Sequence, residues 1–410
     1  MYITNKEYLK EQCHSIATGL LSPSIPGFLF VLILLFQSAS PARAQGFSFK
    51  DDLNLGGYIK ELGSLSASNP FDEFRYDNVL HHRLESSWDI SESLNIRMDI
   101  RTRLLNGYSV RHTPNLGNYY DNDPGYMDLS EVLIDTDETL WHATIDRLQA
   151  TWYHEDLEIT AGRQRLNWGR TFVWNPNDLF NNFAYLNFDY EERPGTDALR
   201  ATYNWSYASG IEVAYSPQKE WDQSVLAAKL RSTIASYDAQ FLLGHFKEDI
   251  ALGTGWSGYL GDAGIKGELT YFHPEEEFWE ETGVVTATLG VDYMFANSLY
   301  LRSELLYNGG WREAFNPAAT LRRPPSAKDL FIAQTGAFAS ASYPVHPLVN
   351  VSFSAITSFS RPIFIAIPEA TVSLAENWDA TVLAQVLQGE VLTGATDTPN
   401  ILYARLTYSF

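Results

Sequence analysis

The chain has 410 residues, with 29 basic and 50 acidic side chains and a formal net charge of −21 at pH 7. Proteins that bind nucleic acid present basic surfaces, so this acidic balance argues against nucleic acid as the main partner. The single cysteine excludes a disulfide framework and a cysteine metal site within the chain.

The N-terminal segment predicts export. The apolar run at 27–36 is too short for a membrane-spanning helix, which needs about 20 residues. It is followed by Ala42-Arg43-Ala44, the small-x-small pattern of signal-peptide cleavage. We therefore expect residues 1–44 to be a cleaved signal peptide and residues 45–410 to be the mature chain. Removing the peptide takes away three basic and two acidic residues, which moves the formal charge from −21 to −22.

Residues 94–104 show the strand pattern of the mature chain most clearly. Apolar and polar side chains alternate with a period of two, which predicts a strand with two unlike faces. A soluble β-sandwich would show the same alternation. On a lipid-facing position near the bilayer midplane, an arginine costs about 2–4 kcal/mol. In a membrane barrel, Arg97, Arg101 and Arg103 must therefore face the lumen.

Similar segments of about ten residues recur along the mature chain, as transmembrane barrels require. Lipid cannot satisfy an open sheet edge, so a membrane role requires a closed barrel. The predicted strands are 53–62, 79–88, 94–104, 145–153, 157–166, 196–206, 210–217, 224–234, 237–246, 250–260, 264–273, 284–295, 298–308, 330–343, 348–359, 364–375, 379–388 and 401–410.

The connections between these strands favour an even barrel. Short turns fall between an even strand and the next odd one, and long loops fall between an odd strand and the next even one. That arrangement is typical of outer-membrane barrels, with short turns in the periplasm and long loops outside. The sequence therefore predicts an all-β fold, a transmembrane antiparallel up-and-down β-barrel of about 18 strands. Sixteen strands is the alternative count.

The most distinctive motif begins at Gly162-Arg-Gln-Arg-Leu-Asn-Trp-Gly169 and continues through Trp174-Asn-Pro-Asn-Asp-Leu-Phe180 to Asp189-Tyr-Glu-Glu-Arg-Pro-Gly195-Thr-Asp-Ala-Leu-Arg200. It resembles a stretch of uncharacterised porin-like outer-membrane proteins, in which a strand opens into an Asn-Pro-x-Asp loop. The resemblance covers roughly a tenth of the mature chain. It implies a barrel family and no catalytic chemistry.

The loop at 167–194 is too rich in aromatic side chains for a freely solvated loop. We expect it to fold into the lumen, as porin constriction loops do; packing over the barrel rim is the alternative. Just before it, Arg163 and Arg165 share the parity of apolar strand residues. A bulge at Gly162 would turn both arginines inward.

Two further patterns carry little functional weight. Gly253-Thr-Gly255-Trp-Ser-Gly258 matches the dinucleotide fingerprint but lacks the following helix and βαβ unit, so we interpret it as a glycine-softened strand. Asp121, Asp123 and Asp128 offer oxygen ligands for calcium, although a solvated loop is the simpler interpretation. The sequence predicts no catalytic residue, no metal site and no cofactor.

At the C-terminus, an apolar stripe on alternate residues runs to the last position through Leu406, Tyr408 and Phe410. It resembles the C-terminal assembly signal of Gram-negative outer-membrane barrels, with the terminal phenylalanine as its most specific feature. The resemblance implies export through the periplasm to the cell outer membrane, with the barrel assembly machinery and outer-membrane lipid as partners.

The leading functional hypothesis is a porin-like channel for passive or substrate-selective passage of small solutes, and not an enzyme. A barrel that acts as a sleeve for a lipoprotein or a periplasmic carrier is the alternative, followed by an outer-membrane enzyme. A homo-oligomer is left open. The predicted lumen and constriction residues are Arg83, Arg97, Arg101, Arg103, Arg147, Arg163, Arg165, Asp178, Asp189, Glu191 and Glu192.

Overall fold

The computed structural model describes residues 52–67, 74–182, 194–276, 278–311, 326–389 and 400–410. The predicted signal peptide lies outside the described residues. Among the residues that are described, no helix combines the length and the apolar character needed to cross a membrane.

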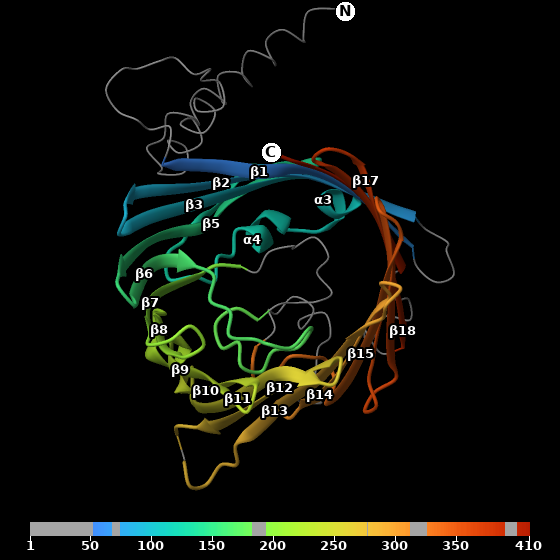
Figure 1. The fold of residues 1–410 in the computed structure, drawn as a ribbon. Coiled ribbons are helices and arrows are strands. Elements are labelled where there is room, and N and C mark those ends of the chain that lie inside the picture. The colour runs from blue at the N-terminus through green and yellow to red at the C-terminus, as the bar shows by residue number, and fades with distance from the viewer. Residues whose placement is uncertain (1–51, 68–73, 183–193, 277, 312–325, 390–399) are drawn as a thin grey trace, which may run out of the picture. The chain divides into compact units, whose positions relative to one another are not determined.

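Strands dominate the described chain (Figure 1). The strands are β1 (Leu53–Ala67), β2 (Phe74–Ser91), β3 (Leu94–Gly107), β4 (Ser130–Asp135), β5 (Thr139–His154), β6 (Leu157–Gln164), β7 (Thr196–Asn204), β8 (Gly210–Ser216), β9 (Val225–Ile234), β10 (Tyr237–Phe246), β11 (Asp249–Leu260), β12 (Ala263–Pro274), β13 (Val284–Met294), β14 (Tyr300–Asn308), β15 (Thr335–His346), β16 (Val349–Thr357), β17 (Ile363–Ala375), β18 (Trp378–Gly389) and β19 (Asn400–Ser409). The helices are α3 (Tyr108–His112), α4 (Leu116–Tyr120) and the single 3-10 turn η1 (Trp221–Gln223).

These strands form one antiparallel sheet that closes on itself, because β19 pairs with β1. The last residue takes part in the closure: the Phe410 N–H donates to the Gly57 carbonyl at 3.0 Å, and the Gly57 N–H donates to the Phe410 carbonyl at 3.1 Å. A closed sheet leaves no edge to be satisfied by lipid. The prediction of an antiparallel barrel is confirmed.

The wall has the predicted 18 strand positions although the sheet contains 19 strands. One edge of β5 is occupied by β3 along most of its length. The other edge is shared, since β4 pairs with residues 140–144 and β6 pairs with residues 148–154. β4 therefore takes the place in the wall that β6 leaves when the chain turns into the lumen.

β5 begins six residues earlier than the predicted strand at 145–153. The register with β3 shifts between Asp99 and Ile100, which leaves Asp146 as an extra residue in β5. Such a bulge reverses the alternation of faces, so the pattern before Asp146 does not continue the pattern after it. Elsewhere β2 is longer than predicted and β15 starts five residues later.

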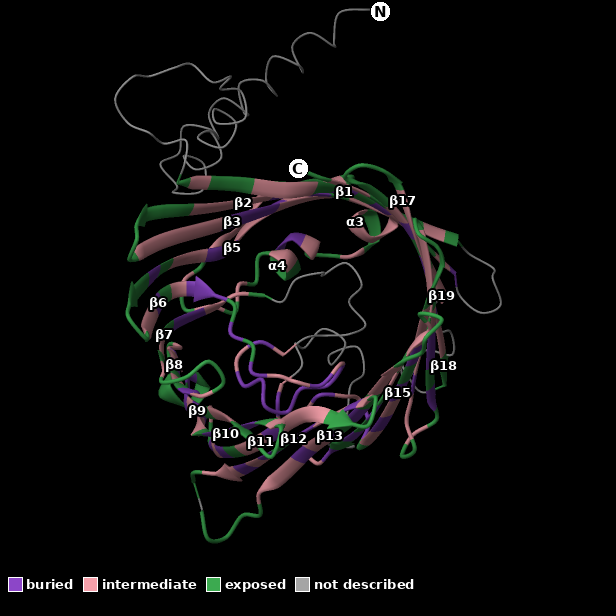
Figure 2. Ribbon diagram, in the orientation of Figure 1, coloured by how far each residue is buried: buried purple, intermediate pink, exposed green. Residues whose placement is uncertain are grey.

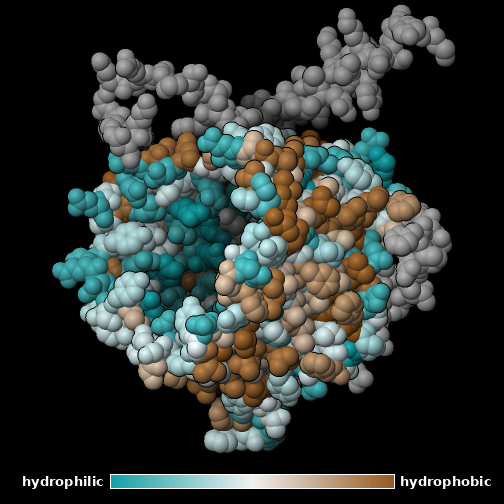
Figure 3. Space-filling model, turned by 45° about the vertical axis from the view of Figure 1, so that its right-hand side comes forward, coloured by the Kyte–Doolittle hydropathy of each residue, from teal (hydrophilic) through white to brown (hydrophobic). Residues whose placement is uncertain are grey.

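The two faces of the wall differ in polarity. On β14, Leu301, Leu305 and Tyr307 are exposed on the outer face, whereas Glu304 and Asn308 point inward and are buried. Figure 3 shows hydrophobic side chains over the outer surface and hydrophilic ones around the hollowed opening. An apolar outer face and a polar inner face are what a barrel in lipid requires.

The hydrophobic core lies inside the barrel, between the wall and chain segments that enter the lumen (Figure 2). One cluster includes Trp168 and Leu179 with Phe246 and Phe272 of the wall. A second includes Val173, Trp174, Leu330, Phe338 and Ile365. Fully burying a large apolar side chain contributes about 1.5–3 kcal/mol, so the entering segments are packed structure.

Candidate functional site

Arginines predicted to line the lumen lie on adjacent wall strands. The register places Arg83 of β2 opposite Arg101 of β3. One step away, Asp99 of β3 lies opposite Arg147 of β5. We call Arg83, Arg97, Arg101 and Arg147, with the carboxylates Glu85, Asp99 and Asp146, the arginine wall.

Arg83 is the centre of the arginine wall. Its guanidinium contacts Glu85 at 2.8 Å, Asp99 at 2.9 Å and Asp146 at 2.5 Å. Only 1% of its side chain is exposed. Burying a charge is costly unless it is paired and hydrogen-bonded, and these three carboxylates supply that pairing. Arg101 lies 3.5 Å from the same Asp146 carboxylate.

Asp146, the bulged residue of β5, is not among the residues that the sequence predicted to line the lumen. The bulge places Asp146 and Arg147 next to each other on the buried side, and an Arg147 N–H donates to the Asp146 carbonyl at 2.7 Å. The sequence signal is the break in alternation at Ile145-Asp146-Arg147. The arginine wall thus brings four arginines of β2, β3 and β5 together with three carboxylates from the same strands.

Arg97 differs from the other arginines because 40% of its side chain is exposed. It still contacts Asp99 at 2.7 Å and Glu85 at 3.7 Å. Arg103 has another environment: its guanidinium lies over the ring of Tyr120 in α4, at 4.5 Å.

Arg163 lies in a separate ion-pair cluster. It contacts Asp123 at 2.6 Å and Asp197 at 2.7 Å. Asp123 also accepts hydrogen bonds from the N–H groups of Gly125 and Leu129, so this carboxylate orders the loop before β4. Arg165 is exposed beyond the end of β6.

The predicted bulge at Gly162 is wrong. The pairings of β6 with β5 and β7 run through Gly162 without a register shift. Gly162 instead adopts a φ of 111°, and a Cβ there would lie 2.2 Å from the Leu148 carbonyl oxygen. The positive φ and the close approach of the neighbouring strand both require glycine.

The described part of the motif loop, residues 165–182, lies inside the ring of strands (Figure 1). We call this segment the inner loop. Its amides bond to Glu268 of β12 and Glu304 of β14, two carboxylates that the sequence analysis did not select. Asp178 of the inner loop is fully buried. Asp189, Glu191 and Glu192 lie outside the described residues.

The glycines of the nucleotide-like pattern make room for the inner loop. A Cβ on Gly255 would lie 2.7 Å from the Asn177 Nδ2, and one on Gly253 would lie 2.9 Å from the Asn177 Oδ1. β11 therefore has no inward side chain where Asn177 approaches. The approach of Asn177 to β11 therefore explains why positions 253 and 255 are glycine.

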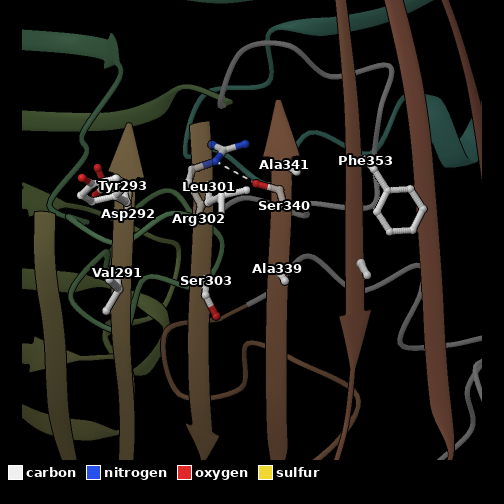
Figure 4. A pocket seen from close by; sticks show the side chains of 11 residues that line it. Val291, Asp292, Tyr293, Leu301, Arg302, Ser303, Ala339, Ser340, Ala341 and Phe353 are labelled. Atoms are coloured by element: carbon white, nitrogen blue, oxygen red, sulfur yellow. Dashed lines mark hydrogen bonds between the residues drawn. The ribbon is translucent and has the colours of Figure 1, made fainter. Parts of the chain in front are cut away.

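A groove of about 470 Å³ lies on the outer face of the barrel, across β13, β14, β15 and β16 (Figure 4). Its sides are formed by Val291, Leu301 and Phe353, all exposed outward, and alanines such as Ala339 form part of its lining. The groove belongs to the lipid-facing surface and is separate from the lumen.

No protein-family model matches the chain, and no curated protein matches it. Solved structures do match. OccAB2 of Acinetobacter baumannii has a TM-score of 0.57 at 7% identity, over 89% of this chain and 99% of that one. OpdK of Pseudomonas aeruginosa, solved with vanillate, has a TM-score of 0.54 at 7% identity, over 87% of this chain and 98% of that one. OccK3 of Pseudomonas aeruginosa has a TM-score of 0.54 at 7% identity, over 88% and 97%.

At such low identity the likeness shows the fold alone. It agrees with the closed antiparallel wall described above. The chain therefore has the fold of the Gram-negative outer-membrane porins, a closed antiparallel barrel of 18 strand positions.

Proposed function

We propose that this protein is an outer-membrane channel for the passive, selective passage of small solutes, with its narrowest section between the arginine wall and the inner loop. The observation that carries the proposal is a closed barrel whose inner face is charged and whose lumen contains an ordered loop. Barrels of this strand number are wide enough for an aqueous passage. An inward loop narrows such a passage to the dimensions of small solutes.

The charges of the arginine wall support a preference for anionic solutes. Its three carboxylates all pair with the buried Arg83. Arg97 pairs with Asp99 but keeps 40% of its side chain exposed, so its guanidinium is a positive group that a solute in the lumen would meet. A narrow passage with low-dielectric walls focuses the field of a few charges. The vanillate bound to OpdK illustrates the class of small carboxylate that such a passage would suit.

Single-channel recording in a planar bilayer with asymmetric salt tests the proposal. Wild-type protein is expected to form discrete channels whose reversal potential shows anion preference. Changing Arg97, Arg101 and Arg103 together to serine should move the reversal potential toward cation preference. Neutralising Glu275 and Glu276 in the loop after β12 is the control and should have little effect. Absence of conductance from folded protein would contradict the channel, and control by the outer glutamates would contradict the selectivity mechanism.

A further inference from the structure

The inner loop is hydrogen-bonded to two carboxylates of the barrel that do not belong to the arginine wall. Glu268 of β12 and Glu304 of β14 are both 0% exposed. Their strands lie on either side of β13, so the two carboxylates approach the loop from neighbouring parts of the wall.

Glu268 binds both ends of an eight-residue segment of the loop. One carboxylate oxygen accepts the N–H of Arg170 and, at 2.9 Å, the N–H of Thr171. The other oxygen accepts the N–H of Asn177 at 2.9 Å. The Thr171 hydroxyl adds a bond to the first oxygen at 3.2 Å. One side chain thereby closes the segment into a compact turn.

Glu304 binds the middle of the same segment. Its Oε2 accepts the N–H of Phe172 at 2.6 Å and the N–H of Val173 at 3.1 Å, and its Oε1 accepts the N–H of Trp174 at 2.9 Å. Three successive amides that converge on one anion form the backbone concavity known as a nest. Here the anion belongs to the barrel wall.

These hydrogen bonds satisfy buried polar groups of both the inner loop and the two glutamates. In the described part of the chain, the inner loop belongs to no strand of the sheet. Its N–H groups therefore need other acceptors, because a buried N–H without a partner is costly. A buried carboxylate without donors is costlier still. Hydrogen bonds to an ionised acceptor are roughly twice as strong as neutral ones, so the loop and the two glutamates stabilise each other.

The wall is also shaped to receive the segment. A Cβ on Gly290 of β13 would lie 2.9 Å from the Phe172 ring, and one on Gly336 of β15 would lie 2.9 Å from the Trp174 ring. Together with Gly253 and Gly255 on β11, these glycines leave space beneath the loop. Hydrogen bonding and packing therefore select one position for it.

We propose that Glu268 and Glu304 are positioning residues that fix the inner loop inside the lumen against β11–β15, and that the position they impose limits the conductance of the channel. The anchoring of the inner loop follows from the hydrogen bonds and packing contacts of residues 170–177 alone. Its effect on conductance rests on the proposed channel function.

The test uses the double variant Glu268→Gln/Glu304→Gln, which keeps side-chain shape but replaces one acceptor oxygen of each carboxylate with a donor group. Hydrogen exchange of the amides of residues 170–177, measured by mass spectrometry on folded protein in detergent, reports the loop position. Exchange is expected to become at least tenfold faster. Glu369→Gln on β17 is the matched control, since Glu369 makes no hydrogen bond to the described part of the inner loop, and it should leave exchange unchanged.

Single-channel conductance of the same proteins tests whether the loop position limits the pore, and it should rise in the double variant. Unchanged exchange would overturn the anchoring, and faster exchange with unchanged conductance would overturn the link to the pore. A wild-type protein with protected amides but no conductance would contradict the channel and leave the anchoring intact. If the double variant does not fold, the two single variants and Gly336→Ala, which presses on Trp174 without removing a hydrogen bond, apply the same two measurements.

Discussion

At the scale of single residues, the arginine wall separates two roles that the sequence alone could not distinguish. Arg83 and Arg97 both sit on polar positions of alternating strands, and the periodicity correctly places them on one face. Their exposure differs widely, with 1% of the Arg83 side chain and 40% of the Arg97 side chain accessible. Arg83 contacts Asp146 in addition to Glu85 and Asp99, and the inward position of Asp146 depends on a bulge that the sequence marks only by a break in alternation. The face was predictable, but the pairing was not.

Replacing Arg83 by serine should therefore lower stability, whereas replacing Arg97 should mainly change selectivity. Removing Arg83 leaves buried carboxylates without a principal partner, and breaking a buried ion pair in this way costs about 3–5 kcal/mol. Arg97→Ser exposes a partner that Arg83 still contacts. Thermal unfolding of the two refolded variants in detergent, followed by the loss of heat-modifiable migration on gels, compares their stability with that of the wild type. Equal destabilisation by the two variants would contradict this division of roles.

At the scale of elements, the period-two pattern predicted most of the wall, including β3 over nearly its full length. It failed where the pattern itself changes phase, as at the bulge in β5, and where short elements follow no period, as in β4, α3 and α4. The aromatic content of the motif loop indicated that it needs a packing surface. Its anchors were not predictable, because Glu268 and Glu304 lie 91 or more residues away from the amides they bind.

The face assignment of β3 can be tested by exchanging apolar and basic positions. Ile96→Arg should impair insertion into lipid, because an arginine on the lipid side of a barrel costs about 2–4 kcal/mol near the midplane. Arg97→Lys, on the adjacent inward position, should insert like wild type. The fraction folded after dilution from urea into lipid vesicles gives the comparison. Equal loss for the two variants would mean that β3 does not present Ile96 to lipid.

At the scale of the whole barrel, closure depends on a narrow contact between the two ends of the sheet. A Cβ on Gly57 would lie 2.1 Å from the Arg83 carbonyl oxygen and 3.0 Å from the Phe410 ring. Gly57→Ala should therefore hinder closure of β1 against its neighbours. Gly63→Ala on the same strand is the control, since its Cβ would have 3.7 Å of clearance to Tyr76. Heat-modifiable migration of the refolded proteins reports closure, and a normal yield of folded Gly57→Ala protein would contradict the expectation.

The contacts of the inner loop also set an order of events during folding. Trp174 and its acceptor Glu304 are 130 positions apart in the sequence, and Thr171 and Glu268 are 97 positions apart. Contacts of such large sequence separation form slowly, because the chain between them must first be ordered. The loop can dock only after β12 and β14 have joined the growing sheet. Until then its aromatic side chains have no wall to pack against, so docking of the loop is a late step in folding.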